Sequence, residues 1–122
     1  MVLITGGAGF VGANLAHRLL GQGQRVRVFD NLSRPGVERN LEWLQREHPG
    51  QLELCQADVR DADAVLRAMA GASSVFHFAA QVAVTTSLDD PREGFTVNAM
   101  GTLNVLEAAR AQAQPPSEFL TS

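Results

Sequence analysis

Closely spaced glycines follow a short apolar run near the start of the chain, and their spacing is typical of phosphate binding. Gly6, Gly9 and Gly12 fit the pattern T-G-x-x-G-x-x-G, and Gly7 replaces Gly6 in the alternative frame G-x-G-x-x-G. In such loops the first glycine allows a tight turn from strand to helix, and the middle one lets the backbone approach a pyrophosphate. The last lets the helix pack close to the strand, so that its free N–H groups and positive dipole end face the phosphates.

An acidic residue at the end of the second expected strand strengthens this interpretation. A carboxylate at Asp30 can accept hydrogen bonds from both hydroxyls of an adenosine ribose, and it repels a 2′-phosphate, which favours NAD over NADP. Nearby Arg34 complicates that preference, and Asp30 could instead cap a loop. Because a strand precedes the glycines and a helix follows them, we expect dinucleotide binding rather than a purely structural turn.

The remaining chemically interesting side chains have more ordinary interpretations. Asp58 follows the third expected strand and could meet the exocyclic amine of an adenine, or it could be a plain turn residue. His77 lies within a strand and is predicted to be a buried, hydrogen-bonded histidine, whereas His48 is predicted to cap a helix end rather than bind a metal. Cys55, the single cysteine, is predicted to be a small buried hydrophobe, and it cannot form an internal disulfide, which fits a reducing compartment.

The elements that must position these residues alternate regularly along the chain. Apolar runs predict strands at 2–4, 26–30, 52–54, 74–80 and 118–122, and helical periodicity predicts helices at 10–22, 37–48, 62–70 and 90–112. The near-continuous apolarity of residues 74–80 suggests burial on both faces, as in a parallel sheet. Right-handed crossovers then produce an open parallel sheet with helices on both faces, whose ligands bind beyond the carboxyl ends of the strands.

Composition limits the classes of function that this chain can have. With 122 residues, 45% of them hydrophobic, the chain forms one domain at most, and it is large enough for a real core. A net charge of −3 argues against a nucleic-acid partner. No apolar run approaches the length of a membrane span, and no leader-like segment opens the chain, so we expect a cytoplasmic protein with no metal site and no membrane contact.

Conserved-looking motifs in the right order make the chain resemble a known family. Residues 5–12, 29–32, 57–61, 76–81 and 98–104 are similar to the extended short-chain dehydrogenase/reductases, which include NAD-dependent nucleotide-sugar epimerases and dehydratases. The resemblance implies a Rossmann-type, doubly wound α/β sheet of strand order 3-2-1-4-5 in three layers, with residues 1–122 forming a truncated NAD-binding domain. Residues 30–34, 40–44 and 81–87 look most like epimerases of CDP-linked deoxysugars, which implies a nucleotide-sugar substrate and a homo-oligomeric parent protein.

The same resemblance implies a role for each matching residue. The positions expected to contact NAD are Gly6, Gly9, Phe10, Val11, Gly12, Asp30, Asn31, Leu32, Asp58, Val59, Phe78, Ala79, Ala80, Gln81 and Asn98. The resemblance implies that Gly9, Phe10 and Val11 hold the pyrophosphate, and that Asp30 and Asn31 hold the adenosine ribose. It also implies that Asp58 and Val59 meet the adenine and that Ala79, Ala80 and Gln81 lie along the nicotinamide. Asn98 matches a helix asparagine that supports the active site. Thr85, Thr86 and Ser87 match a loop near the sugar, although they could simply form a polar loop.

One departure from the family pattern affects the expected activity. Family members transfer a hydride from a sugar carbinol to NAD⁺, helped by a tyrosine and a lysine in a Y-x-x-x-K helix that follows the fifth strand. This sequence has no tyrosine, and all ten of its basic residues are arginine. We therefore expect the cofactor half of an enzyme, inactive alone and prone to marginal stability or self-association through an unpaired sheet edge.

Three functions remain open on the sequence alone. The chain could come from a nucleotide-sugar epimerase, or from a dehydratase or decarboxylase with the same N-terminal half. It could also be a short, non-catalytic module that binds NAD.

Overall fold

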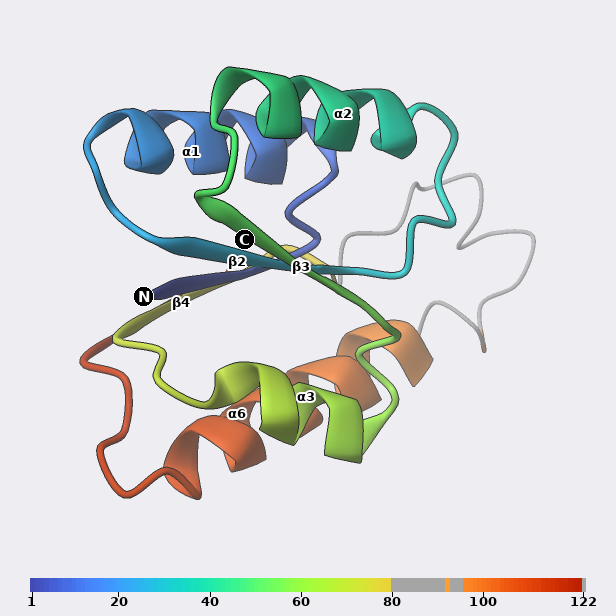
Figure 1. Cartoon of the computed structure of the whole chain (residues 1–122). Coiled ribbons are helices and arrows are strands. Elements are labelled where there is room, and N and C mark those ends of the chain that lie inside the picture. Colours follow the sequence, from blue (N-terminus) through green and yellow to red (C-terminus); the bar gives the residue numbers. More distant parts are fainter. Residues whose placement is uncertain (80–91, 93–95, 122) are drawn as a thin grey trace.

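The computed structural model describes residues 1–79, 92 and 96–121, which form a parallel sheet between two layers of helices (Figure 1). The strands are β1 (Val2–Thr5), β2 (Val26–Asp30), β3 (Leu52–Gln56), β4 (Ser74–His77) and β5 (Glu118–Thr121). They pair in the order β3-β2-β1-β4-β5, all parallel, which confirms the predicted doubly wound topology.

The helices follow the predicted alternation. They are α1 (Phe10–Gly21), α2 (Val37–Glu47), α3 (Ala62–Met69) and α6 (Gly101–Arg110), and a π-helical segment, η1 (Thr96–Met100), leads directly into α6. In Figure 1, α1 and α2 cover one face of the sheet, and α3 and α6 cover the other. Asp61 caps α3 as predicted, because its carboxylate accepts a hydrogen bond from the Ala64 N–H at 3.2 Å.

Several element ends differ from the predicted ones by one or more residues, and two of these differences have a clear local reason. β4 stops at His77 rather than Ala80, because its partner β1 ends at Thr5, opposite His77, where the glycine turn begins. The last helix ends at Arg110 rather than Gln112, since the Gln112 N–H bonds to the Ala109 carbonyl in a tightened final turn. Residues 90, 91 and 93–95 of that predicted helix lie outside the described residues.

The core is divided by the sheet into two apolar clusters. Val2 and Ile4 of β1 face α1 and α2, whereas Leu3 faces α3 and α6. Because β1 is the central strand, both of its faces are buried, and this explains its uninterrupted apolar sequence.

Burial falls toward the edges of the sheet. On β4, Val75 and His77 are fully buried on one face, whereas Phe76 on the other face is only half-buried. The prediction that both faces of this strand are buried is therefore confirmed for one face only. Cys55 is half-buried rather than buried as predicted, because β3 is an edge strand with a partly exposed surface.

Arg27 of β2 connects three elements through one guanidinium group. Its Nη1 donates to the carbonyl oxygens of Ala68 at 2.7 Å and Ala70 at 2.9 Å, at the end of α3. Its Nε donates to the Glu53 carboxylate of β3 at 2.9 Å. The side chain is 18% exposed, so this arrangement holds the end of α3 against the sheet in a partly buried environment.

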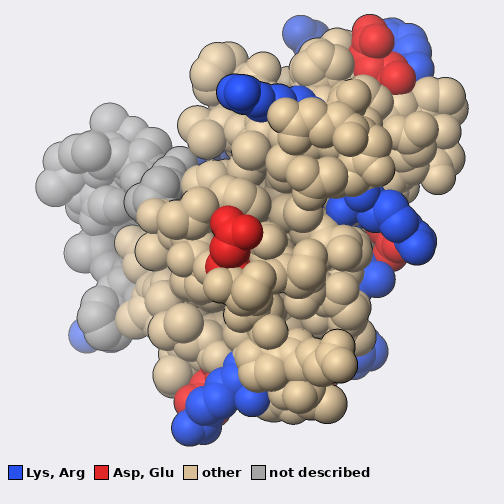
Figure 2. Space-filling view, turned by 90° about the vertical axis from the view of Figure 1, so that its left-hand side faces the viewer, with Lys and Arg blue, Asp and Glu red and all other residues tan. Residues whose placement is uncertain are grey.

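The surface carries separated charges. Figure 2 shows the side on which β1 begins, where arginine groups are set apart by uncharged surface instead of forming one continuous patch. Among the residues that the structure describes, no helix combines the length and the apolar character needed to cross a bilayer.

Candidate functional site

The glycine turn connects β1 to α1 at the carboxyl edge of the sheet. Gly6 has a φ of +71°, and a Cβ there would lie 2.8 Å from the Ala79 nitrogen. A Cβ on Gly12 would collide with the Gly6 carbonyl oxygen and lie 2.7 Å from the Gly7 Cα. The protein's own packing therefore requires glycine at both positions, as the motif predicts.

Gly9 is less crowded by the described residues than Gly6 and Gly12. Its backbone is extended, and among the described residues beyond its chain neighbours a Cβ there would meet one atom within 4 Å, the Gly6 carbonyl oxygen at a close 3.3 Å. An alanine at Gly9 would therefore need a shift of only a few tenths of an ångström from that oxygen. Room beside a glycine at the turn is what a closely approaching ligand needs.

The start of α1 presents main-chain N–H groups toward this space. No side chain caps the helix, and its first turn carries no acidic residue. The hydrogen bond from the Ala13 N–H to the Gly9 carbonyl, 2.8 Å long, is the first of the helix ladder, so the N–H groups of Phe10, Val11 and Gly12 precede it. Such a terminus suits an anion, because the N–H groups and the helix dipole both favour negative charge.

Asp30 lies directly against this turn. Its carboxylate accepts hydrogen bonds from the Ala8 N–H at 3.1 Å and from the Leu32 N–H at 2.8 Å, and the residue is 9% exposed. The loop-capping interpretation of Asp30 is therefore confirmed. It does not compete with ligand binding, since a carboxylate can accept about four hydrogen bonds.

Ala8 is also held from the opposite side. The Asn40 side chain, from α2, donates from Nδ2 to the Ala8 carbonyl oxygen at 2.8 Å. Asn40 is not among the residues that the sequence motifs predict to lie at the site. A signal was present, because Asn40 is a polar residue on the helix face formed by the buried residues Val37, Leu41 and Leu44.

Asp58 sits in a turn next to the ribose candidates. Its carboxylate accepts from the Arg60 main-chain N–H at 2.9 Å and from the Arg60 guanidinium at 2.7 Å. The Arg60 contact lowers the pKa of Asp58 below its ordinary value, against the opposing effect of burial, and the nearby Asn31 side chain lowers this pKa slightly further. The turn interpretation of Asp58 is confirmed.

A buried chain of hydrogen bonds supports the end of β4. The Thr5 hydroxyl lies 2.6 Å from His77 Nδ1, and His77 Nε2 lies 3.2 Å from the Thr102 hydroxyl. The Thr5 oxygen already accepts the N–H groups of Phe78 and Ala79, so its own hydrogen must point to His77 Nδ1. His77 is therefore the Nε2–H tautomer, and the prediction of a buried, hydrogen-bonded histidine is confirmed.

We predict that His77 makes stability fall at acidic pH. Burial lowers the pKa of His77 below its ordinary value of 6.5. As the pH falls through 6.5, the unfolded chain takes up a proton that the folded chain excludes, so the free energy of unfolding decreases. Urea unfolding at pH 7.5 and 5.5, together with NMR titration of the His77 ring, checks this. A His77 pKa above 6.5 or a protonated Nδ1 would contradict it.

The structure gathers many of the predicted cofactor residues and leaves others apart. The glycine turn, Asp30, Asn31, Asp58 and the half-buried Phe78 and Ala79 all lie at the carboxyl ends of the strands. The Val59 side chain is buried in the core, so only its main chain could meet an adenine. Asn98 is exposed in η1. Ala80, Gln81, Thr85, Thr86 and Ser87 lie outside the described residues.

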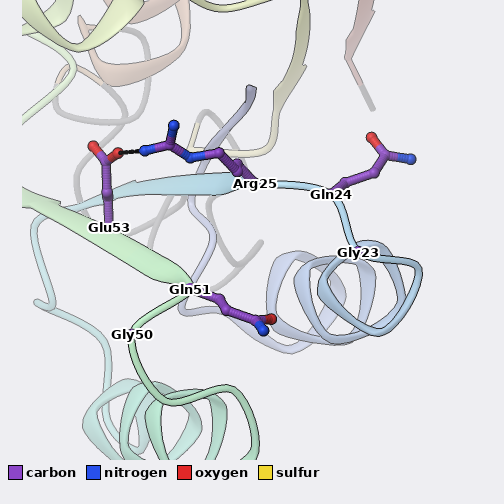
Figure 3. A pocket seen from close by; sticks show the side chains of 6 residues that line it. All are labelled: Gly23, Gln24, Arg25, Gly50, Gln51 and Glu53. Carbon is purple, nitrogen blue, oxygen red and sulfur yellow. Dashed lines mark hydrogen bonds and ion pairs between the residues drawn. The ribbon is translucent and has the colours of Figure 1, made fainter.

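A separate cavity of about 350 Å³ opens at the opposite edge of the sheet (Figure 3). Residues that precede or begin β2 and β3 line it: Gly23, Gln24, Arg25, Gly50, Gln51 and Glu53. Figure 3 shows Arg25 and Glu53 turned toward each other in an exposed ion pair of 3.4 Å. Since ligands of such sheets bind at the carboxyl ends of the strands, we take the glycine turn as the candidate site. Within the described part of the chain, no group of three metal-ligating side chains occurs.

Comparison with known proteins agrees with this geometry. A family model described as GDP-mannose 4,6 dehydratase matches residues 3–122. The chain belongs to this family. It is 49% identical over 111 residues to CDP-paratose 2-epimerase of Salmonella typhi, covering 89% of this chain and 32% of that protein. The chain thus spans about one third of the length of this relative, and the resemblance predicted from the motifs is confirmed.

Solved structures of similar fold include proteins crystallised with NAD. A UDP-glucose 4-epimerase from Thermus thermophilus in complex with NAD is 38% identical, with a TM-score of 0.73 over 89% of this chain and 33% of the other. A dTDP-glucose 4,6-dehydratase from Streptomyces venezuelae with NAD bound is 31% identical, with a TM-score of 0.79 over 88% and 35%. The family is therefore one of NAD-dependent epimerases and dehydratases.

Proposed function

We propose that this chain binds NAD at the glycine turn and forms the cofactor half of a nucleotide-sugar epimerase resembling CDP-paratose 2-epimerase. The observation that carries the proposal is the glycine turn itself, where the lightly crowded Gly9 precedes a helix start without a side-chain cap and the Asp30 carboxylate binds the N–H of the adjacent Ala8. Uncapped N–H groups suit a pyrophosphate, and an adjacent carboxylate suits a ribose diol.

In this proposal each group has a distinct task. The main-chain N–H groups of Phe10 and Val11 bind the pyrophosphate, Asp30 and Asn31 bind the adenosine ribose, and the Asp58–Val59 main chain lies beside the adenine. Phe78, Ala79, Ala80 and Gln81 lie along the nicotinamide, Asn98 supports the active site, and Thr85, Thr86 and Ser87 lie near the sugar. When bound, NAD supplies reversible acceptance of a hydride from a sugar carbinol.

The proton transfer that must accompany hydride transfer needs a general acid–base group. Since these 122 residues contain neither tyrosine nor lysine, we propose that they bind and orient NAD but do not turn over substrate alone. The sequence of the gene beyond codon 122 tests this. A Y-x-x-x-K motif there supports a catalytic parent protein, whether epimerase or dehydratase, and its absence leaves NAD binding as the function.

A dehydratase is the second candidate, because the matching family model is described by that activity and dTDP-glucose 4,6-dehydratases are 35% identical to this chain. Products distinguish the two activities. An epimerase converts CDP-paratose to an isomer of equal mass, whereas a dehydratase releases water from its sugar.

Titration calorimetry with NAD and NADP tests the cofactor directly. We expect NAD to bind at least about tenfold more tightly than NADP, because the Asp30 carboxylate repels a 2′-phosphate. Equal affinity for the two nucleotides would refute the assignment of Asp30, and no binding of either would refute the proposed function.

A further inference from the structure

The Ala8–Gly9 peptide unit is fixed at both of its polar ends. Its carbonyl oxygen, on Ala8, accepts the Asn40 amide at 2.8 Å, and its N–H, on Gly9, donates to the Gly6 carbonyl at 3.1 Å. The preceding unit is fixed by the bond from the Ala8 N–H to Asp30. Ala8 is completely buried, so water cannot replace any of these partners. The orientation of Gly9, the residue that precedes α1, is therefore determined by side chains from β2 and α2.

Asn40 has the chemistry and the position that this contact requires. It lies one turn after the start of α2, where Gly36 in the left-handed region precedes the helix, and Val37 and Leu41 hold the same face against the core. A carbonyl oxygen needs a donor, which an amide supplies and a carboxylate does not. Removing the donor would take away the partner of the buried Ala8 carbonyl oxygen, so the turn would have to move to recover one.

We propose that Asn40 is a positioning residue for the pyrophosphate of the bound nucleotide, acting through Ala8 without touching the ligand. The inference rests on the proposed NAD binding and adds a residue to that site. By fixing the Ala8–Gly9 peptide, Asn40 sets the direction of the Phe10 and Val11 N–H groups that follow. Removing the Asn40 side chain therefore weakens the binding of ligands that carry a diphosphate more than the binding of adenosine alone.

Two nucleotides separate this role from a general effect on folding. We expect Asn40→Ala to raise the dissociation constant of ADP by about tenfold, which corresponds to the loss of about one well-made hydrogen bond. The dissociation constant of adenosine should rise by less than about twofold. Asn40→Asp keeps the shape but lacks the donor, so it should show the same selective loss. Gln112→Ala is the matched control, because it removes an amide-to-carbonyl bond of 3.0 Å within the last helical turn, far along the sequence from the glycine turn.

Each outcome of these titrations decides the question. Selective loss of ADP affinity in both Asn40 variants, with Gln112→Ala unchanged, supports the positioning role. Equal loss for ADP and adenosine, or no loss, overturns it, and so does a failure of both Asn40 variants to fold, which would make the contact purely structural. Failure of the unaltered protein to bind ADP or NAD would instead refute the proposed function.

Discussion

Alanine in place of Gly12 is expected to destabilise the protein by about 3 kcal/mol, a large effect for one methyl group. The added Cβ would collide with the Gly6 carbonyl oxygen and lie 2.7 Å from the Gly7 Cα, both of which are backbone atoms that cannot turn away. α1 would have to move off the turn. Urea or thermal unfolding of the variant measures the loss.

The same substitution at Gly9 is expected to leave folding intact and abolish most NAD binding. Among the described residues beyond its chain neighbours, a Cβ there meets the Gly6 oxygen alone, at 3.3 Å, and in our proposal it occupies room that the pyrophosphate needs. If the pyrophosphate loses its two charge-assisted hydrogen bonds to the Phe10 and Val11 N–H groups, at about 1.5 kcal/mol each, the dissociation constant of NAD should rise roughly 100-fold. Unfolding experiments should therefore show a large loss of stability for Gly12→Ala and little for Gly9→Ala, and calorimetry should show that Gly9→Ala has lost most of its NAD affinity.

Gly21→Ala is the control for both substitutions. It lies at the last position of α1, and apart from the backbone of its own helix a Cβ there would meet no atom of the described residues within 4 Å. Alanine should be neutral or stabilise by up to about 1 kcal/mol, because it favours the helix, and NAD binding should not change. Weakened folding in Gly9→Ala, or unchanged NAD binding in it, would contradict the separation of roles.

Replacing Asp30 by alanine is expected to impair both ligand binding and stability. The ribose would lose an ionised acceptor, which is worth about 1.5 to 3 kcal/mol, or roughly 10- to 150-fold in the dissociation constant of NAD. The preference for NAD over NADP should narrow, since the negative charge that repels a 2′-phosphate is gone. The buried Ala8 N–H would also lose its partner, which should lower the free energy of unfolding by about 1 to 3 kcal/mol.

Asn31→Ala separates the two effects of Asp30. Asn31 is exposed and contributes no hydrogen bond to Ala8, so this variant should weaken NAD with little effect on the position of the glycine turn. If Asp30→Ala kept full stability, the 3.1 Å bond to Ala8 would not be supporting the turn. If it kept its NAD affinity, the ribose assignment would be wrong.

Most of the architecture could be predicted because each element carries a local signal. The run from Val2 to Ile4 had no polar interruption, as expected for a central strand, and Asp61 preceded an apolar helical stripe. The glycine spacing also has its own physical cause, the close approach of α1 to the turn. Such signals depend on neighbours within a few residues, which the sequence contains directly.

The hydrogen bonds that hold the site together could not be predicted in the same way. Asn40 reaches Ala8 across 32 positions of sequence, and Thr5 meets His77 across 72. Both contacts depend on how α2 and β4 lie relative to β1, and that placement results from packing of the whole core. The sequence showed only that an imidazole lay within the apolar run of residues 74–80, which was enough to predict that His77 is buried but not to find its partners.

The guanidinium of Arg27 couples the opening of α3 to the separation of β2 from β3. Because one side chain on β2 holds the last carbonyls of α3 and the Glu53 carboxylate, α3 cannot detach without exposing a charge that is 18% exposed in the folded state. Local fluctuations that release amide hydrogens of α3 should therefore be nearly as rare as those that separate β2 from β3. In terms of hydrogen exchange, the helix and the strand pair form a single cooperative unit, although their residues are distant in the sequence.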